Sequence, residues 1–176
     1  VHTIDGKQYY FVDGRIRRNG TVNDNGQTYL CLSDGSLISL SKGWNYINSD
    51  WYYVENGQLL KNCIFKIKSD YYAFDSDGRM QNYTLFTFTE DGQTISCFAQ
   101  EGGKLLTNAS ITYGSTTYYF DAEGKFRSGL QTINGKQYYL VNGQMKTNEA
   151  LEIDGSYYLA DSTGQLKQIS GDTGWY

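Results

Sequence analysis

Residues 132–139 read TINGKQYY and residues 3–10 read TIDGKQYY, so one octapeptide occurs twice with a single difference. Each copy has a turn signal, Asn-Gly or Asp-Gly, shortly before a pair of tyrosines. Asn-Gly and Asp-Gly favour the type I′ turn of a β-hairpin, because both central residues of that turn have positive φ. Tyrosine has a high strand propensity. The octapeptide therefore predicts a tight turn that leads into a strand.

The same pattern recurs at intervals of about 20 residues, which is typical of a repeat protein. We use the first Tyr of each pair as the marker of a copy, and a degenerate copy has Ile95 at this position. The markers are Tyr9, Tyr29, Tyr52, Tyr72, Ile95, Tyr118, Tyr138 and Tyr157. Further turn signals follow the tyrosines, for example Asp34-Gly35 and Asp77-Gly78, and we expect type I′ turns there as well.

Together the copies predict one all-β array of about eight hairpins. A single two-stranded hairpin is marginal in water, whereas stacked hairpins bury the face that they share. We therefore expect a β-solenoid, with a tail at 168–176 that resembles the start of a further repeat. The expected repeats are approximately 1–18, 19–41, 42–61, 62–81, 82–107, 108–127, 128–146 and 147–167.

Alternation along the strands predicts which face is buried. The marker and the residue two positions later share one face, because successive side chains point to opposite sides. The second of these columns is apolar throughout: Phe11, Cys31, Val54, Phe74, Cys97, Phe120, Leu140 and Leu159. Another apolar column follows the second turn: Ile16, Leu37, Leu59, Met80, Leu105, Phe126, Met145 and Leu166. We expect these columns to form the core, and any ligand to bind the mixed, variable opposite face.

Composition excludes several functions. The chain has 17 Tyr, 20 Gly and no Pro, and its net charge is −4. Proteins that bind nucleic acid rely on Lys and Arg to neutralise phosphates, so a nucleic-acid partner is not expected. No run of 18 apolar residues occurs, so membrane insertion is not expected either. The sequence begins with Val1 rather than Met, and we expect a larger parent protein.

Catalytic and metal-binding signatures are not evident. The three cysteines, Cys31, Cys63 and Cys97, lack the CxxC spacing of zinc sites. The loop Asp75-Ser76-Asp77-Gly78 lacks the further ligands of a calcium loop, because Ala73 and Thr84 stand where they are needed. His2 is the only histidine, so a nucleophile in the array has no nearby imidazole base. We expect no metal, no cofactor and no enzymatic activity of this chain itself.

Two stretches carry a resemblance to a known family. KGWNYINSDWYYVENGQLLKN at 42–62 and SGLQTINGKQYYLVNGQMKTN at 128–148 resemble the cell-wall-binding repeats of Gram-positive surface proteins. That family includes choline-binding modules, glucan-binding repeats of glucosyltransferases and the repetitive regions of clostridial toxins. The resemblance implies a β-solenoid without catalytic activity. It also implies an extracellular, cell-surface location, and attachment of a secreted protein to a wall polymer or glycan.

The resemblance also implies candidate site residues. In choline-binding modules the ligand lies in a cage made by the Trp of a Gly-Trp pair, the aromatic residue before the tyrosine pair, and an aromatic residue of the next copy. These positions correspond to Trp44, Trp51 and Tyr71. The alternative is that this cluster only packs the hairpin surface.

A column of outer tyrosines gives further candidates, which either stack against sugars or pair across strands to stabilise the sheet. They are Tyr53 and, as weaker candidates, Tyr10, Tyr119, Tyr139 and Tyr158, with Trp175 of the tail as a further aromatic. Three functions therefore stay open. They are binding of a wall polymer or carbohydrate, binding of choline on teichoic acid, and a structural stalk or interaction scaffold with no small ligand.

Overall fold

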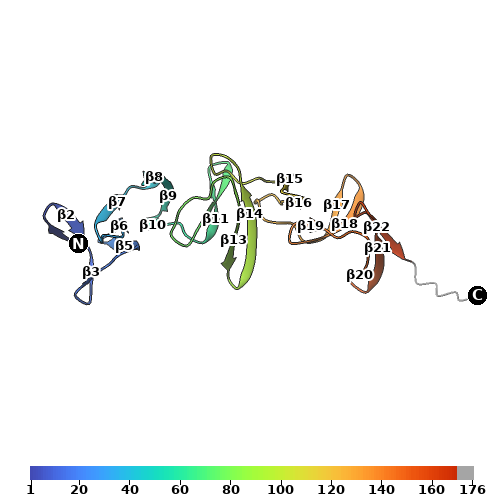
Figure 1. Ribbon diagram of the computed structural model, residues 1–176, viewed down its shortest axis with the longest axis horizontal. Helices are drawn as coiled ribbons and strands as arrows, with labels where there is room; N and C mark the ends of the chain where they lie inside the picture. Colours follow the sequence, from blue (N-terminus) through green and yellow to red (C-terminus); the bar gives the residue numbers. More distant parts are fainter. Residues whose placement is uncertain (170–176) are drawn as a thin grey trace, which may run out of the picture. The chain divides into compact units, whose positions relative to one another are not determined.

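The structure, a computed structural model, describes residues 1–169. Every helix or strand assigned within that range is a β-strand, and Figure 1 shows short strands joined by turns from β2 to β22. The predicted all-β class is confirmed. Within the described range no helix has the length and apolar character needed to cross a membrane.

The chain divides into two compact units. The first holds residues 1–94 and 99–105, and the second holds residues 95–98 and the chain from Leu106 onward. The strands of the first unit are β1 (His2–Ile4), β2 (Lys7–Tyr9), β3 (Phe11–Val12), β4 (Arg15–Ile16), β5 (Gly20–Asp24), β6 (Gln27–Cys31), β7 (Leu37–Leu40), β8 (Gly43–Ile47), β9 (Asp50–Glu55), β10 (Gln58–Leu59), β11 (Cys63–Ile67), β12 (Asp70–Phe74) and β13 (Thr84–Glu90).

Strand β14 (Gln93–Ala99) has residues in both units. The strands of the second unit are β15 (Ser110–Tyr113), β16 (Thr116–Tyr119), β17 (Gly129–Ile133), β18 (Lys136–Val141), β19 (Gln144–Met145), β20 (Glu149–Ile153), β21 (Ser156–Ala160) and β22 (Leu166–Ile169). Each sheet of the described chain contains two or three strands that follow one another in the sequence. The fold is therefore built from local antiparallel hairpins.

The Asn-Gly and Asp-Gly turns that precede tyrosine pairs have the predicted geometry. Asn134 and Gly135 have φ of 50° and 76°, and Asp5 and Gly6 have φ of 48° and 76°. Two consecutive positive φ angles match the right-handed twist of the flanking strands, and Asn, Asp and Gly tolerate them best. The turn chemistry that the sequence predicts therefore fixes the hairpin register.

Some of the second turns are of another kind, which corrects the expectation for Asp34-Gly35 and Asp77-Gly78. In these loops only the Gly has positive φ, 88° at Gly35 and 85° at Gly78. An aspartate oxygen organises each loop by accepting backbone N–H groups. Oδ1 of Asp75, for example, accepts from the N–H groups of Asp77 and Arg79 at 2.9 and 2.8 Å. The aspartate side chain thus stabilises a loop in which only one residue has the left-handed conformation.

The predicted core column is buried in six of the eight copies. Phe74, Phe120, Leu140 and Cys97 have no exposed surface, and Cys31 and Val54 are also buried, at 2% and 3% exposed. Phe11 of the first copy is half-buried. Leu159 of the last copy is 51% exposed.

The last copy differs from the predicted pattern of burial because its marker is Tyr158 and not Tyr157. In the hairpin of β20 and β21, Glu149 pairs with Ala160, as Gly129 pairs with Leu140 in the preceding hairpin. Ala160 is buried, at 5% exposed, and occupies the core position expected for Leu159. A slip of one residue moves every side chain of a strand to the other face.

Successive copies contact each other through the backbone within each unit. The N–H of Met80 donates to the carbonyl of Trp51, and the N–H of Leu105 donates to that of Tyr71, both at 2.8 Å. In the second unit the N–H of Phe126 donates to the carbonyl of Ser96 at 2.9 Å. The apolar column after the second turn is therefore held against the strand of the preceding copy.

The degenerate fifth copy also forms a hairpin. Strands β13 and β14 make a two-stranded sheet, and Asp91 and Gly92 at its turn have φ of 48° and 77°. Its marker position is occupied by Ile95, and Cys97 is fully buried. The missing tyrosine pair therefore leaves the hairpin itself intact.

Candidate functional site

Three of the predicted site residues lie on one face of the hairpin formed by β8 and β9. Trp44 of β8 pairs with Tyr53 of β9, and Tyr46 pairs with Trp51. Residues opposite each other in an antiparallel pair point to the same side of the sheet. These four rings therefore share the face that is opposite to the buried side chains of Tyr52 and Val54.

Trp44 is the centre of this aromatic cluster. Its ring centroid lies 5.0 Å from that of Tyr53, 5.9 Å from that of Trp51 and 5.0 Å from that of Tyr72 in the next hairpin. All three contacts are edge-to-face, the arrangement that the aromatic quadrupole favours. The cluster thus joins the third hairpin to the fourth.

A pocket of about 320 Å³ opens beside these rings. It is lined by Trp44, Trp51, Tyr72, Met80 and Gly102, and we call it the aromatic pocket. Trp44 and Trp51 are 37% and 42% exposed, so their surfaces remain accessible to a ligand. The lining has no charged side chain.

Tyr71, the residue expected to close the site, does not line the aromatic pocket. The Lys66 Nζ instead lies 5.4 Å from the centroid of its ring, and Tyr72 forms the pocket wall. Tyr53 contacts the Trp44 ring but is not a lining residue. Sequence reasoning missed Tyr72 and Met80 because both belong to columns expected to be wholly in the core.

The weaker candidates have different surroundings. Tyr10, Tyr119 and Tyr139 are half-buried. The residues paired with Tyr119 and Tyr139 are Ser110 and Leu130, so neither hairpin repeats the Trp44–Tyr53 arrangement.

The two remaining candidates are at the end of the chain. Tyr158 is not an outer tyrosine, because the register of β21 makes it the marker, and it packs against the buried cluster of Ile153, Ala160 and Leu166. Trp175 lies outside the described residues.

The thiols are unsuited to nucleophilic chemistry. Burial raises the pKa of Cys97 to about 12 and that of Cys63 to about 11. The thiolate is the nucleophile and the metal ligand, so both groups stay in their unreactive form at neutral pH. Among residues 1–169 no group of three or more His, Cys, Asp or Glu side chains is arranged to hold a metal ion. Trp44, Trp51 and Tyr72 together form an accessible aromatic surface.

Comparison with known sequences supports the family resemblance. The family model described as "Putative cell wall binding repeat" matches residues 111–126, which lie in the sixth repeat. Glucosyltransferase-S of Streptococcus mutans serotype c is 26% identical over 175 residues, or 99% of this chain. The chain spans 11% of the length of that relative. The predicted resemblance to cell-wall-binding repeats is confirmed.

Solved structures of similar fold come from Streptococcus pneumoniae. Choline binding protein F, solved in the presence of a peptidoglycan analogue (tetrasaccharide-pentapeptide), is 25% identical with a TM-score of 0.54, over 90% of this chain and 55% of that one. The choline-binding domain of CbpL is 22% identical with a TM-score of 0.54, over 94% of this chain and 85% of that one. The similarity to the choline-binding domain of CbpL shows a shared fold.

Proposed function

We propose that this chain is a non-catalytic module that binds a cell-wall polymer or glycan and attaches a larger secreted protein to a Gram-positive surface. The observation that carries the proposal is the accessible aromatic pocket on a scaffold that resembles cell-wall-binding repeats. Aromatic faces with little conformational freedom are suited to bind both sugars and organic cations.

Choline on teichoic acid is a second candidate ligand, and a specific observation favours it. Trp44, Trp51 and Tyr72 surround a space that is small for a ligand pocket and has no cationic lining residue. A quaternary ammonium is attracted to aromatic faces and needs no hydrogen-bond donor. Met80 adds a soft, polarisable wall. The chemistry of the lining therefore suits a compact organic cation.

We further propose that the hairpins stack as a β-solenoid of about eight repeats. The backbone hydrogen bonds between successive copies in each unit support this arrangement. Because only one repeat has both tryptophans, the array provides one strong site and a series of weaker surfaces. Weak sites on one chain raise the overall affinity for a repetitive polymer through their effective concentration.

We also propose an extracellular location and a longer parent protein, and the same comparison supports both. The relative from S. mutans is much longer than this chain, which aligns with 11% of it. A binding module of this kind raises the local concentration of an attached enzyme on its polymeric substrate.

Retention on purified Gram-positive cell walls tests the proposal. We expect the protein to bind walls, and Trp44→Ala to weaken binding about ten-fold or more, as expected from the loss of one desolvated cation–π or stacking contact. Leu130→Ala is the matched control, because Leu130 occupies the same position in the seventh hairpin and is 40% exposed. The control should bind as the native protein does.

Three outcomes separate the candidates. Elution by free choline, together with loss of Trp fluorescence on adding choline, identifies the choline-binding module. Wall binding that choline does not compete, but that Trp44→Ala weakens, identifies a glycan or another wall polymer. Folded protein that binds neither walls nor choline contradicts the proposal and favours a stalk or interaction scaffold.

A further inference from the structure

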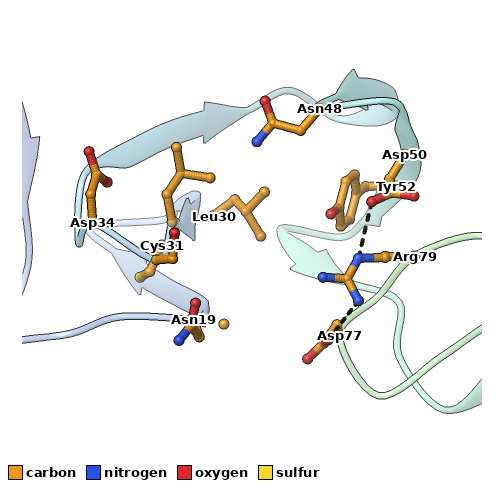
Figure 2. Close-up of a pocket in the computed structure, with 12 residues that line it drawn as sticks. Asn19, Leu30, Cys31, Asp34, Asn48, Asp50, Tyr52, Asp77 and Arg79 are labelled. Atoms are coloured by element: carbon orange, nitrogen blue, oxygen red, sulfur yellow. Dashed lines mark hydrogen bonds and ion pairs between the residues drawn. The ribbon is translucent and has the colours of Figure 1, made fainter.

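A second cavity, of about 540 Å³, lies in the first unit and shares no lining residue with the aromatic pocket. Figure 2 shows side chains that surround it from two sides. Its lining comes from the second, third and fourth repeats: Asn19, Gly20, Leu30, Cys31, Leu32, Ser33, Asp34, Asn48, Asp50, Tyr52, Asp77 and Arg79. Trp51 and Tyr52 are neighbours in β9 that point to opposite faces, so this one strand contributes to both spaces.

Two asparagine side chains in the lining have unused hydrogen-bonding capacity. Asn19 and Asn48 lie on opposite sides of the cavity in Figure 2. Both side chains are exposed, and neither amide forms a hydrogen bond to another residue in the part of the chain that the structure describes. Each amide can donate two hydrogen bonds and accept two. Together they offer paired donors and acceptors to a ligand with hydroxyl groups.

Each charged group in the cavity lining has a partner of opposite sign, and two of the carboxylates share one guanidinium. Arg79 Nε lies 3.1 Å from Oδ2 of Asp50, and Arg79 Nη1 donates to Oδ2 of Asp77 at 2.8 Å. Asp34 is paired with Lys7 Nζ at 3.2 Å and accepts from the N–H and hydroxyl groups of Ser36. Paired charges of this kind do not select strongly for a charged ligand. With one carboxylate in excess, the lining disfavours an anionic ligand and is compatible with a neutral, polar one.

Apolar side chains supply one surface of the cavity. Leu30 and Tyr52 are 7% and 4% exposed, and Figure 2 shows them facing each other. Burial, with the nearby charge of Asp50, raises the pKa of Tyr52, against the opposing effect of its hydrogen bond with Arg79. The phenol is therefore neutral at physiological pH. A ring and an aliphatic side chain next to planar polar groups suit the mixed apolar and hydroxylated faces of a sugar.

We propose that this cavity is a second binding site, for a neutral oligosaccharide. Its volume lies within the range of small-molecule sites. The exposed amides of Asn19 and Asn48 bind ring hydroxyls, and only the exposed edges of Leu30 and Tyr52, which otherwise lie in the core, border the apolar sugar face. The inference rests on the proposed wall-binding function and adds a glycan site on the opposite side of the hairpin from the aromatic pocket.

Two sources supply this chemistry, an α-glucan and the N-acetylated glycan of the wall. Isomaltotetraose and chitotetraose are the corresponding probes. Each is titrated into ¹⁵N-labelled protein while the side-chain amides of Asn19 and Asn48 and the Nε of Arg79 are followed by NMR. We expect saturable shifts at these three groups with at least one probe. The probe that binds more tightly identifies the source.

The test variant is Asn19→Gly combined with Asn48→Gly. Both residues have positive φ, 49° and 51°, so glycine removes the amides without straining the backbone. The matched control is Asn108→Gly with Asn134→Gly, in the second unit, where φ is 49° and 50°. Loss of two hydrogen bonds should weaken saccharide binding about ten-fold or more in the test variant. The control should keep native affinity.

Absence of shifts at the three groups with both probes overturns the proposal, as does an equal loss of affinity in test and control variants. The same titration on Trp44→Ala separates this site from the proposed function. Shifts at Asn19 and Asn48 that persist while wall retention is lost support two sites. If Trp44→Ala loses both the saccharide-induced shifts and the retention on walls, the sugar is assigned to the aromatic pocket and this proposal is overturned. Saccharide binding by a native protein that does not bind walls defeats the wall-binding function alone.

Discussion

Adjacent residues have different roles in β12, because successive side chains of a strand point to opposite faces. Tyr72 lines the aromatic pocket, whereas Tyr71 lies next to Lys66. The sequence directs attention to Tyr71, since it is aromatic on the outer face. The marker tyrosine of one hairpin instead contacts the outer face of the hairpin before it, so a core residue also becomes a pocket wall. The identity of such a residue can be read from the sequence, but its second contact cannot.

Asp34 gives a prediction at the same scale. Hydrogen bonds from Ser36, with Lys7 nearby, lower the pKa of this carboxyl to about 2 from its ordinary 3.8. Because the folded-state pKa is the lower one, the contribution of this carboxylate to stability is complete above about pH 4. The contribution is lost as the pH falls toward 2.

Carboxyl ¹³C NMR measures this directly. We expect Asp34 to titrate with a midpoint near 2, and Ser36→Ala to raise the midpoint, because the Ser36 hydroxyl is the largest cause of the shift. Ser39→Ala, at an exposed site of β7, should leave the midpoint unchanged. A native midpoint close to 3.8 contradicts the loop geometry.

At the scale of the element, a turn determines the register of the strand that follows it. In the regular copies the marker lies three residues after the last residue of the turn, as with Gly135 and Tyr138. Counted from Gly155, the last marker is Tyr158, which is what the pairing of β20 and β21 shows. The tyrosine pair predicts Tyr157 as the marker, whereas the position of the turn predicts Tyr158. The turn is therefore the better indicator of register in this copy.

Loop glycines show how successive elements interlock. A Cβ at Gly35 would overlap Cγ2 of Ile16 in the preceding copy, and a Cβ at Gly78 would lie 2.5 Å from Cδ2 of Leu59. Gly26, by contrast, has positive φ and nothing within 4 Å of an added Cβ. The chain thus contains glycines required for conformation alone and glycines required for contact as well.

This difference predicts unequal costs of substitution. Gly26→Ala should reduce the free energy of unfolding by about 1–2 kcal/mol, from backbone strain alone. Gly35→Ala should cost about 1–3 kcal/mol more, because the methyl group also displaces the stiff side chain of Ile16. Urea unfolding measures both values. The additional Ile16→Ala change should recover part of the extra cost, and equal costs for the two glycine variants contradict the proposed interlock.

At the scale of the whole molecule, the structure shows neighbouring copies in contact within each unit. Met80 and Leu105 each donate a backbone hydrogen bond to the copy before, and the loop glycines accept apolar side chains from it. In such arrays stability is the sum of repeat and interface terms. Two compact units are described, and the boundary between them runs through β14.

The β-solenoid proposal has a measurable consequence at this scale. A compact domain of this length has a radius of gyration of about 16 Å. A stacked array is longer than a compact domain, so small-angle X-ray scattering should give a value well above about 16 Å. The measurement is made on dilute protein at several concentrations to exclude association. A value close to 16 Å for the monomer rejects the solenoid.

The sequence by itself determined the local structure of this protein. Asn-Gly and Asp-Gly placed several of the hairpin turns, and residue alternation identified Phe74, Phe120 and Leu140 as core. It also directed attention to Trp44 and Trp51, because departures from a repeat stand out against the other copies. These inferences succeed because turns and alternation depend on residues a few positions apart.

Only the tertiary structure decided what lies between hairpins. It placed Tyr72 and Met80 in the aromatic pocket and brought Asn19, Asn48 and Arg79 around the second cavity. These residues come from different repeats, and their proximity depends on the offset at which one hairpin packs on the next. Side-chain packing and loop shape set that offset. The repeat pattern does not distinguish one offset from the next, because each is compatible with the same alternation of residues. Both candidate sites therefore depend on contacts between repeats, which periodicity within a repeat does not specify.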